Sequence, residues 1–185
     1  IKILCLTNGN AGHHVMAPKD LAQRRAEEAR TSARLVAAEL EIWHQADGEL
    51  TASIELRQTL IAAIRLYQPD LIVTHRVADY HPDHRATGQL VQDSAYLLQV
   101  PAIVPKVQAM QKMPAILLAY DRFKDPRPHR LDWIIDIKTQ IDTVLAMLAC
   151  HRSQVFEWLP RMMGQRLTAK EEDAWLKKLY LTKPK

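Results

Sequence analysis

The sequence predicts an α/β domain of the Rossmann-like three-layer class, with a mostly parallel sheet. Three observations support this prediction. Short apolar runs alternate along the chain with longer segments whose apolar residues recur at helical spacing. Turn-forming residues separate the two kinds of segment. The run 71–74 is short and rich in β-formers, which is typical of a buried parallel strand. A chain of 185 residues can bury one sizeable core, so we expect a single domain over residues 1–185.

The elements follow one another in a regular order. Residues 1–6 form an apolar run that predicts a strand, which ends at the turn-forming cluster 7–12. The next segment predicts a helix over about 18–40, because its apolar or small residues recur at helical spacing: Leu21, Ala29, Ala33, Val36 and Leu40. The same reasoning predicts the remaining elements, namely a strand at 42–44, a helix at 53–67, a strand at 71–74, a helix at 86–98, a strand at 115–120, a helix at 136–151 and a helical tail at 153–185.

The polar loop 75–85 carries the densest group of metal-binding residue types. It contains Asp79-Tyr80-His81-Pro82-Asp83-His84-Arg85, directly after a predicted strand and before a helix. Imidazole is the commonest metal ligand among side chains, and a neighbouring carboxylate fixes its tautomer. In parallel α/β sheets, ligands bind at the carboxyl ends of strands, where this loop lies. The alternative is a polar helix-capping loop in which Asp79 or Asp83 caps the following helix.

The stretch Pro69–His75, followed by Asp79-x-His-Pro-Asp-His-Arg85, resembles the second signature of the PIG-L/LmbE-like zinc-dependent N-deacetylases. That family includes the de-N-acetylase of GlcNAc-phosphatidylinositol and the deacetylases of mycothiol and bacillithiol biosynthesis. The resemblance extends over residues 1–154, because further family landmarks occur in the same order: Leu6–Gly12, Arg25-x-x-Glu28-Ala29, Asp47–Leu50, Asp136-Ile137 and His151–Gln154.

The resemblance implies a role for each polar residue of this loop. His84 would bind Zn²⁺. His81 would act as the protonated partner that stabilises the oxyanion or delivers a proton to the leaving amine. Asp83 would hydrogen-bond a histidine and keep it oriented and charged. Asp79 would line the substrate pocket, or would merely cap the loop.

Outside this loop, the resemblance assigns substrate contact to Arg25. The alternative for Arg25 is a surface ion pair with Glu28 three residues on. His13 and His14 follow the glycine turn, and we expect them to be solvated residues at the rim of the site rather than ligands. For His151 and Gln154 the resemblance implies a structural or pocket-edge role, and the alternative, which we favour, is a packed and hydrogen-bonded pair. Three histidines have no partner spacing that indicates a role: His44, His75 and His129.

The sequence departs from the family in one respect. The family's other two protein ligands and its general base come from an N-terminal His-Pro-Asp-Asp motif, and that string does not occur in this sequence. The chain begins with Ile1 inside an apolar run that matches the family's second strand. We therefore expect the natural protein to carry one further strand and helix upstream.

The implied reaction is Zn²⁺-assisted hydrolysis of the acetyl amide of an N-acetylglucosamine-type sugar or glycoconjugate. The alternative is a non-catalytic descendant that binds a glycan or a protein. A nucleotide binder is disfavoured because no GxGxxG or GxxxxGK loop is present.

The composition argues against a nucleic-acid ligand and a membrane span, and it fits a cytoplasmic location. The net charge of +4 is modest and basic residues are scattered, so a nucleic-acid ligand is not expected. No apolar run approaches the ~18 residues of a membrane span. Two cysteines far apart fit reduced thiols in a cytoplasmic protein. The tail, with Trp175, Leu176, Leu179 and Tyr180, is open to packing on its own domain or on another subunit of a homo-oligomer.

Overall fold

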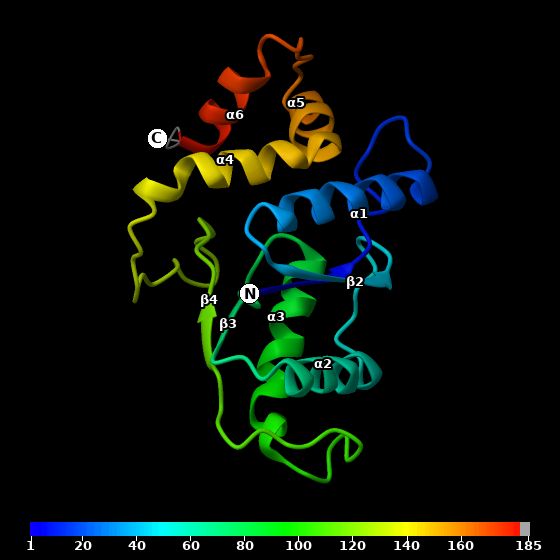
Figure 1. Cartoon of the computed structure of the whole chain (residues 1–185), viewed down its shortest axis with the longest axis vertical. Coiled ribbons are helices and arrows are strands. Elements are labelled where there is room, and N and C mark those ends of the chain that lie inside the picture. The colour runs from blue at the N-terminus through cyan, green and yellow to red at the C-terminus, as the bar shows by residue number, and fades with distance from the viewer. Residues whose placement is uncertain (182–185) are drawn as a thin grey trace. The chain divides into compact units, whose positions relative to one another are not determined.

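The computed structural model describes residues 1–181 and divides the chain into two compact units (Figure 1). The first unit combines Ile1–Asp47 with the chain from Ile135 onward, and the second comprises Gly48–Ile134. Both units mix helices with a pair of parallel strands, so the predicted α/β class is confirmed. The three-layer sandwich and the single domain stay predictions.

The N-terminal part of the first unit is a strand–helix–strand segment. Strand β1 (Lys2–Thr7) pairs in parallel with β2 (Glu39–Gln45), and helix α1 (Pro18–Arg34) connects them and packs on β2. Proline at the first helical position begins α1. The helix ends earlier than predicted because Ala37 adopts a positive φ of 50° and turns the chain into β2.

The C-terminal part of the first unit is helical. It comprises η2 (Lys138–Gln140), α4 (Ile141–Cys150), the π-helical η3 (Ser153–Trp158), α5 (Leu159–Met162) and α6 (Glu172–Leu181). Figure 1 shows α4 along α1, which it contacts. Trp175 and Leu176 are buried against α4 and η3, and the Trp175 indole donates to the Val155 carbonyl at 2.9 Å. The tail therefore packs on its own unit; Lys183 and Lys185 lie outside the described residues.

The second unit contains two helices and two strands. Helix α2 (Ile54–Tyr67) is capped by Ser53, whose hydroxyl accepts the Leu56 N–H, and packs on α3 (Pro82–Ala95). Strand β3 (Leu71–Thr74) pairs in parallel with β4 (Ala115–Leu118), and the short η1 (Tyr96–Gln99) follows α3. Strand β3 is only partly covered, since Leu71 is 49% and Val73 is 61% exposed.

A single buried arginine organises the chain that follows η1. Arg65 of α2 is only 2% exposed. Its guanidinium donates hydrogen bonds to six backbone carbonyls, those of Leu97, Leu98, Val100, Ile103, Val104 and Val107. A buried guanidinium is tolerated only when its donors are satisfied, so this network fixes residues 97–107 against α2.

No helix of residues 1–181 combines the length and the apolar character that crossing a bilayer would need.

Candidate metal-binding site

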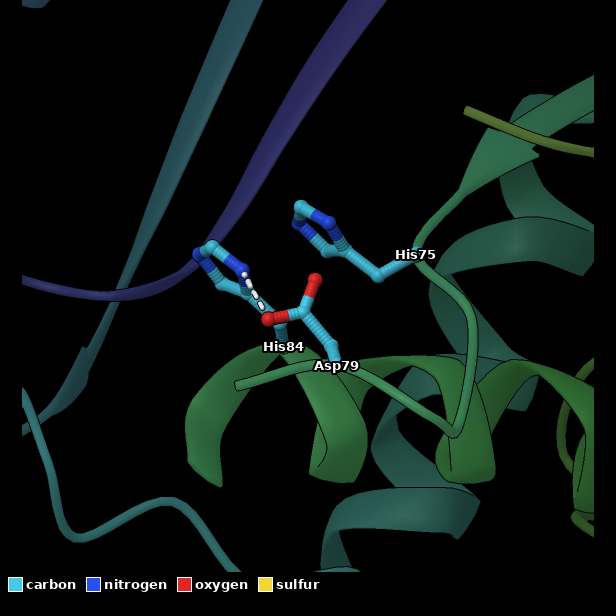
Figure 2. A group of neighbouring side chains, drawn as sticks. All are labelled: His75, Asp79 and His84. Carbon is cyan, nitrogen blue, oxygen red and sulfur yellow. Dashed lines mark hydrogen bonds and ion pairs between the residues drawn. The ribbon is translucent and has the colours of Figure 1, made fainter. Parts of the chain in front are cut away.

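His75, Asp79 and His84 form the one group of three potential metal ligands found among the described residues. His75 directly follows β3, Asp79 lies in the loop, and His84 is in the first turn of α3. Their candidate ligand atoms all lie within 4.8 Å of one another. Figure 2 shows the three side chains gathered together, with the Asp79 carboxylate beside the two imidazoles and in contact with that of His84.

Backbone capping builds this arrangement. Helix α3 begins at Pro82, four residues earlier than predicted, and His81 is its N-cap. The Asp79 carboxylate accepts the His81 N–H at 2.8 Å, which closes the turn 79–81 directly before the helix. The loop therefore does cap the helix, as the alternative supposed. The capping residue, however, is His81 and not Asp79 or Asp83. The early start of α3 also places His84 on a helix rather than in the loop.

Hydrogen bonding prepares His84 to act as a ligand. Its Nδ1 lies 3.1 Å from the Asp79 Oδ1, so a proton on Nδ1 can be donated to the carboxylate while Nε2 stays free. The His75 and His84 rings stack in parallel with centroids 4.1 Å apart. Burial, followed by the charge of His84, lowers the pKa of His75. Both effects favour the neutral imidazole, which is the form that binds a metal ion.

His81 and Asp83 have different environments. The His81 side chain is 36% exposed, and its Nδ1 accepts the Asp83 N–H at 3.3 Å, so its Nε2 is available to a ligand. The Asp83 carboxylate is buried and accepts the N–H groups of Gly48 (2.7 Å) and Leu50 (3.2 Å). The closest approach to a histidine recorded for it is 4.0 Å, to His81 Nδ1. Asp83 therefore anchors the turn at residues 48–50, and the expected hydrogen bond to a histidine is not formed.

Arg25 lies in the first unit, where its guanidinium closes the turn after β1. It donates to the carbonyls of Gly9 (3.0 Å), Ala11 (2.7 Å) and Gly12 (3.0 Å), and to the Gln154 side chain. Its ion pair is with Asp47 at 3.3 Å, and not with Glu28 as the surface alternative supposed. The Arg25 Nε is buried without a hydrogen-bond partner. Contact of Arg25 with a substrate stays a prediction.

Three other predicted residues also lie in the first unit. His151 is half-buried, and burial lowers its pKa. Gln154 contacts Arg25 through the hydrogen bond given above. Glu28 accepts both the N–H (2.9 Å) and the hydroxyl (2.6 Å) of Ser153, which ties α1 to the start of η3. The pairing of His151 with Gln154 stays a prediction, because the Gln154 side chain contacts Arg25 and both residues line a cavity of the first unit.

A network beside the candidate site holds the loop after β4. Arg76, next to His75, is buried and makes a two-point ion pair with Asp121 (2.6 and 2.7 Å). It also donates to the carbonyls of Phe123 (3.1 Å) and Arg127 (3.0 Å). The Tyr80 and Phe123 rings are 5.4 Å apart, so the loop after β4 contacts the loop that carries Asp79.

Sequence reasoning missed His75 and Arg76. A signal for His75 was present, because it directly follows a predicted parallel strand, at the edge where ligands bind. No signal indicated Arg76, since its partners lie 45 or more residues away in the sequence.

The chain is similar to known proteins of one family. A family model described as PIG-L: GlcNAc-PI de-N-acetylase matches residues 1–95. The chain is 23% identical over 178 residues to the 4-oxalmesaconate hydratase of Pseudomonas putida, covering 89% of this chain and 67% of that enzyme.

Two solved structures are also similar. The N,N'-diacetylchitobiose deacetylase of Pyrococcus horikoshii has a TM-score of 0.77 and 25% identity, over 97% of this chain and 66% of its own. The 4-carboxy-2-hydroxymuconate hydratase of Pseudomonas putida has a TM-score of 0.74 over 97% of this chain and 72% of its own; at 20% identity this likeness concerns the fold alone.

Proposed function

Because this chain belongs to the PIG-L family, whose model is described by GlcNAc-PI de-N-acetylase, we propose that the whole protein is a zinc-dependent enzyme that removes the acetyl group from an N-acetylglucosamine-type amide. The observation that carries the proposal is the cluster of His75, Asp79 and His84 at the carboxyl end of β3. The 25% identity with a diacetylchitobiose deacetylase supports the substrate class. The chain spans 66% of that protein, so the proposal concerns the activity of the whole protein.

The donor set fits a zinc ion. Two imidazole nitrogens and a carboxylate oxygen are ligands that Zn²⁺ takes in catalytic sites. We assign His84 as a ligand, as the resemblance implies, and add His75. Asp79 would either bind the ion or orient His84, and its 3.1 Å contact with His84 Nδ1 favours orientation. When bound, zinc supplies polarisation of the acetyl carbonyl and activation of water.

The remaining residues of this loop would supply proton transfer and positioning. His81 holds its Nδ1 against the Asp83 N–H, so its proton lies on Nε2 and can be donated to the developing oxyanion or to the leaving amine. Asp83 would act indirectly, because its carboxylate fixes the turn at 48–50 beside this loop. Arg25 remains a proposed substrate contact, whereas for Asp79 we favour the orientation of His84 over the substrate contact that the resemblance allows. A cytoplasmic location and a Rossmann-like sandwich remain part of the proposal.

A second candidate function is water addition to an unsaturated carboxylate. It is favoured by one observation, the 23% identity with 4-oxalmesaconate hydratase. The same metal ligands would serve both reactions, so the site geometry does not separate them.

The test is an activity comparison on the whole protein loaded with Zn²⁺. Acetate release would be measured with N,N'-diacetylchitobiose and with N-acetylglucosamine as substrates. The loss of 4-oxalmesaconate would be followed by chromatography. We expect acetate release that is lost after chelation and restored by Zn²⁺. Consumption of 4-oxalmesaconate without acetate release would select the hydratase. If the protein showed neither activity, both assignments would be contradicted.

A further inference from the structure

A cavity in the first unit is lined by more positively than negatively charged side chains. It has a volume of about 650 Å³ and lies between the loop before α1 and the segment η3–α5. Its ionisable lining residues are His13, His14, Arg24, Glu157, Arg161 and Arg166. Besides the two histidines, three arginines face a single carboxylate there. We refer to it as the basic pocket.

One carboxylate is already held inside the basic pocket. Glu157 forms a two-point ion pair with Arg24, one contact measuring 2.9 Å, and accepts from His13 Nε2 at 3.0 Å. The His13 Nδ1 accepts the N–H groups of Val15 (3.3 Å) and Met16 (3.1 Å), so the ring proton must lie on Nε2. The expectation that His13 is solvated is wrong, since its side chain is only 4% exposed; His14 is exposed as expected.

The other two arginines of the basic pocket are not neutralised. Arg161 and Arg166 are exposed, and no ion pair is recorded for either within residues 1–181. Guanidinium groups bind carboxylates through paired hydrogen bonds, as Arg24 binds Glu157 here. The cavity also has apolar walls, formed by Met16, Phe156 and Leu167, against which a carbon skeleton can pack.

We propose that the basic pocket is a binding site for a small organic dicarboxylate, held by Arg161 and Arg166. The proposal rests on contacts within the first unit and does not depend on the proposed activity. One wall of the site is fixed by the hydrogen bonds that join Arg24, His13 and Glu157. The two exposed arginines supply the positive charge that the ligand neutralises.

The test is titration calorimetry of the zinc-loaded protein with succinate at physiological ionic strength, with inorganic phosphate and acetate as comparison ligands. We expect saturable one-to-one binding of succinate that exceeds the binding of both other anions. The variant R161A/R166A should bind succinate at least about tenfold more weakly, because two charge-assisted contacts are removed. Both side chains are exposed, so the variant should fold normally.

The matched control is R30A/R34A, which removes the same charge from exposed positions of α1 outside the basic pocket. It should bind succinate as the unchanged protein does. A further variant, Glu157→Gln, weakens the internal competitor for Arg24 and should tighten succinate binding by about two- to tenfold. The proposal is overturned by absence of succinate binding, by preference for phosphate, or by equal weakening in R30A/R34A and R161A/R166A.

Discussion

His84 is the residue on which the candidate site depends most. Its Nδ1 faces the Asp79 carboxylate, and its Nε2 remains available. His84→Ala should therefore abolish stoichiometric zinc binding, measured by elemental analysis after dialysis. His81→Ala removes a proton donor but no ligand, so zinc should be retained while turnover falls by about 10²–10⁴-fold.

The control for these two variants is His44→Ala, an exposed histidine of the first unit. It should change neither zinc content nor turnover. One zinc ion per chain in His84→Ala, with full activity, would contradict the assignment.

Individual residues also show which contacts can be predicted from the sequence and which cannot. His81 and His84 were found because they lie three apart in one motif. Arg76 could not be found in this way, since its partner Asp121 lies 45 residues along the chain. The carboxylate of Asp83 contacts backbone amides more than 30 residues earlier, a pairing that no local pattern encodes.

At the level of elements, Gly88 determines how closely α3 approaches the end of β3. A Cβ atom at this position would lie 2.6 Å from the His75 carbonyl oxygen and 3.1 Å from the Arg76 carbonyl carbon. Gly88→Ala gains about 1 kcal/mol of helix propensity. The clash is with backbone and costs about 1–3 kcal/mol or more, so we expect net destabilisation.

Urea denaturation followed by circular dichroism measures this effect. The matched control is Gln89→Ala, one position along the same helix and exposed, which should change the free energy of unfolding by less than about 0.5 kcal/mol. If Gly88→Ala were as stable as this control, the close approach of α3 to the His75 carbonyl would be wrong.

The second element-scale prediction concerns Arg65. Arg65→Met keeps the aliphatic part of the side chain but leaves six carbonyls without their donor. We expect a loss of about 3–5 kcal/mol in the free energy of unfolding, measured with urea. Arg57→Met, on the same helix with a single 3.9 Å ion pair, should cost less than about 1 kcal/mol. Similar losses in both variants would refute the role given to Arg65.

Most elements were predictable because their signals are local. The strand at 71–74 and the helix capped by Ser53 were predicted to within a residue. The start of α3 was missed although Pro82 at the first helical position marks it. The end of α1 was missed because the positive φ of Ala37 is imposed by the turn into β2, and alanine gives no sign of it.

At the level of the whole molecule, ion pairs in both units make stability depend on acid pH. The hydrogen bond from Arg24 lowers the pKa of Glu157 despite partial burial. Burial raises the pKa of Asp121, but the hydrogen bonds from Arg76 and the Phe123 N–H outweigh this effect and lower it. Groups with a lowered folded-state pKa stabilise the fold above their unfolded-state pKa and lose that contribution as pH falls through the folded value.

The free energy of unfolding should therefore decrease as pH falls below the ordinary pKa of a glutamate or aspartate side chain, about 4, because the pKa values of Glu157 and Asp121 are lowered in the folded state. Urea titrations between about pH 6 and pH 3 measure this slope. Glu157→Gln and Asp121→Asn should each flatten it, while Glu27→Gln, at an exposed position of α1, should not. A slope unchanged in both test variants would exclude these ion pairs as its source.

The division into two units was not predictable, because the first unit joins segments separated by 87 residues of the second, from 48 to 134. Helical and strand periodicity describe single elements and contain no information on which distant segments share a core. The burial of Trp175 and Leu176 against η3 is a case of this kind.

The exposed apolar side chains of β3 affect how the chain 1–185, taken by itself, behaves on heating. Leu71 and Val73 present apolar side chains on a short strand, and such strands associate with one another once neighbouring structure loosens. Thermal scans are therefore expected to end in precipitation, so that the apparent melting temperature shifts with protein concentration and scan rate. Resistance to heat would then be expressed as a half-life at a stated temperature rather than as an equilibrium quantity.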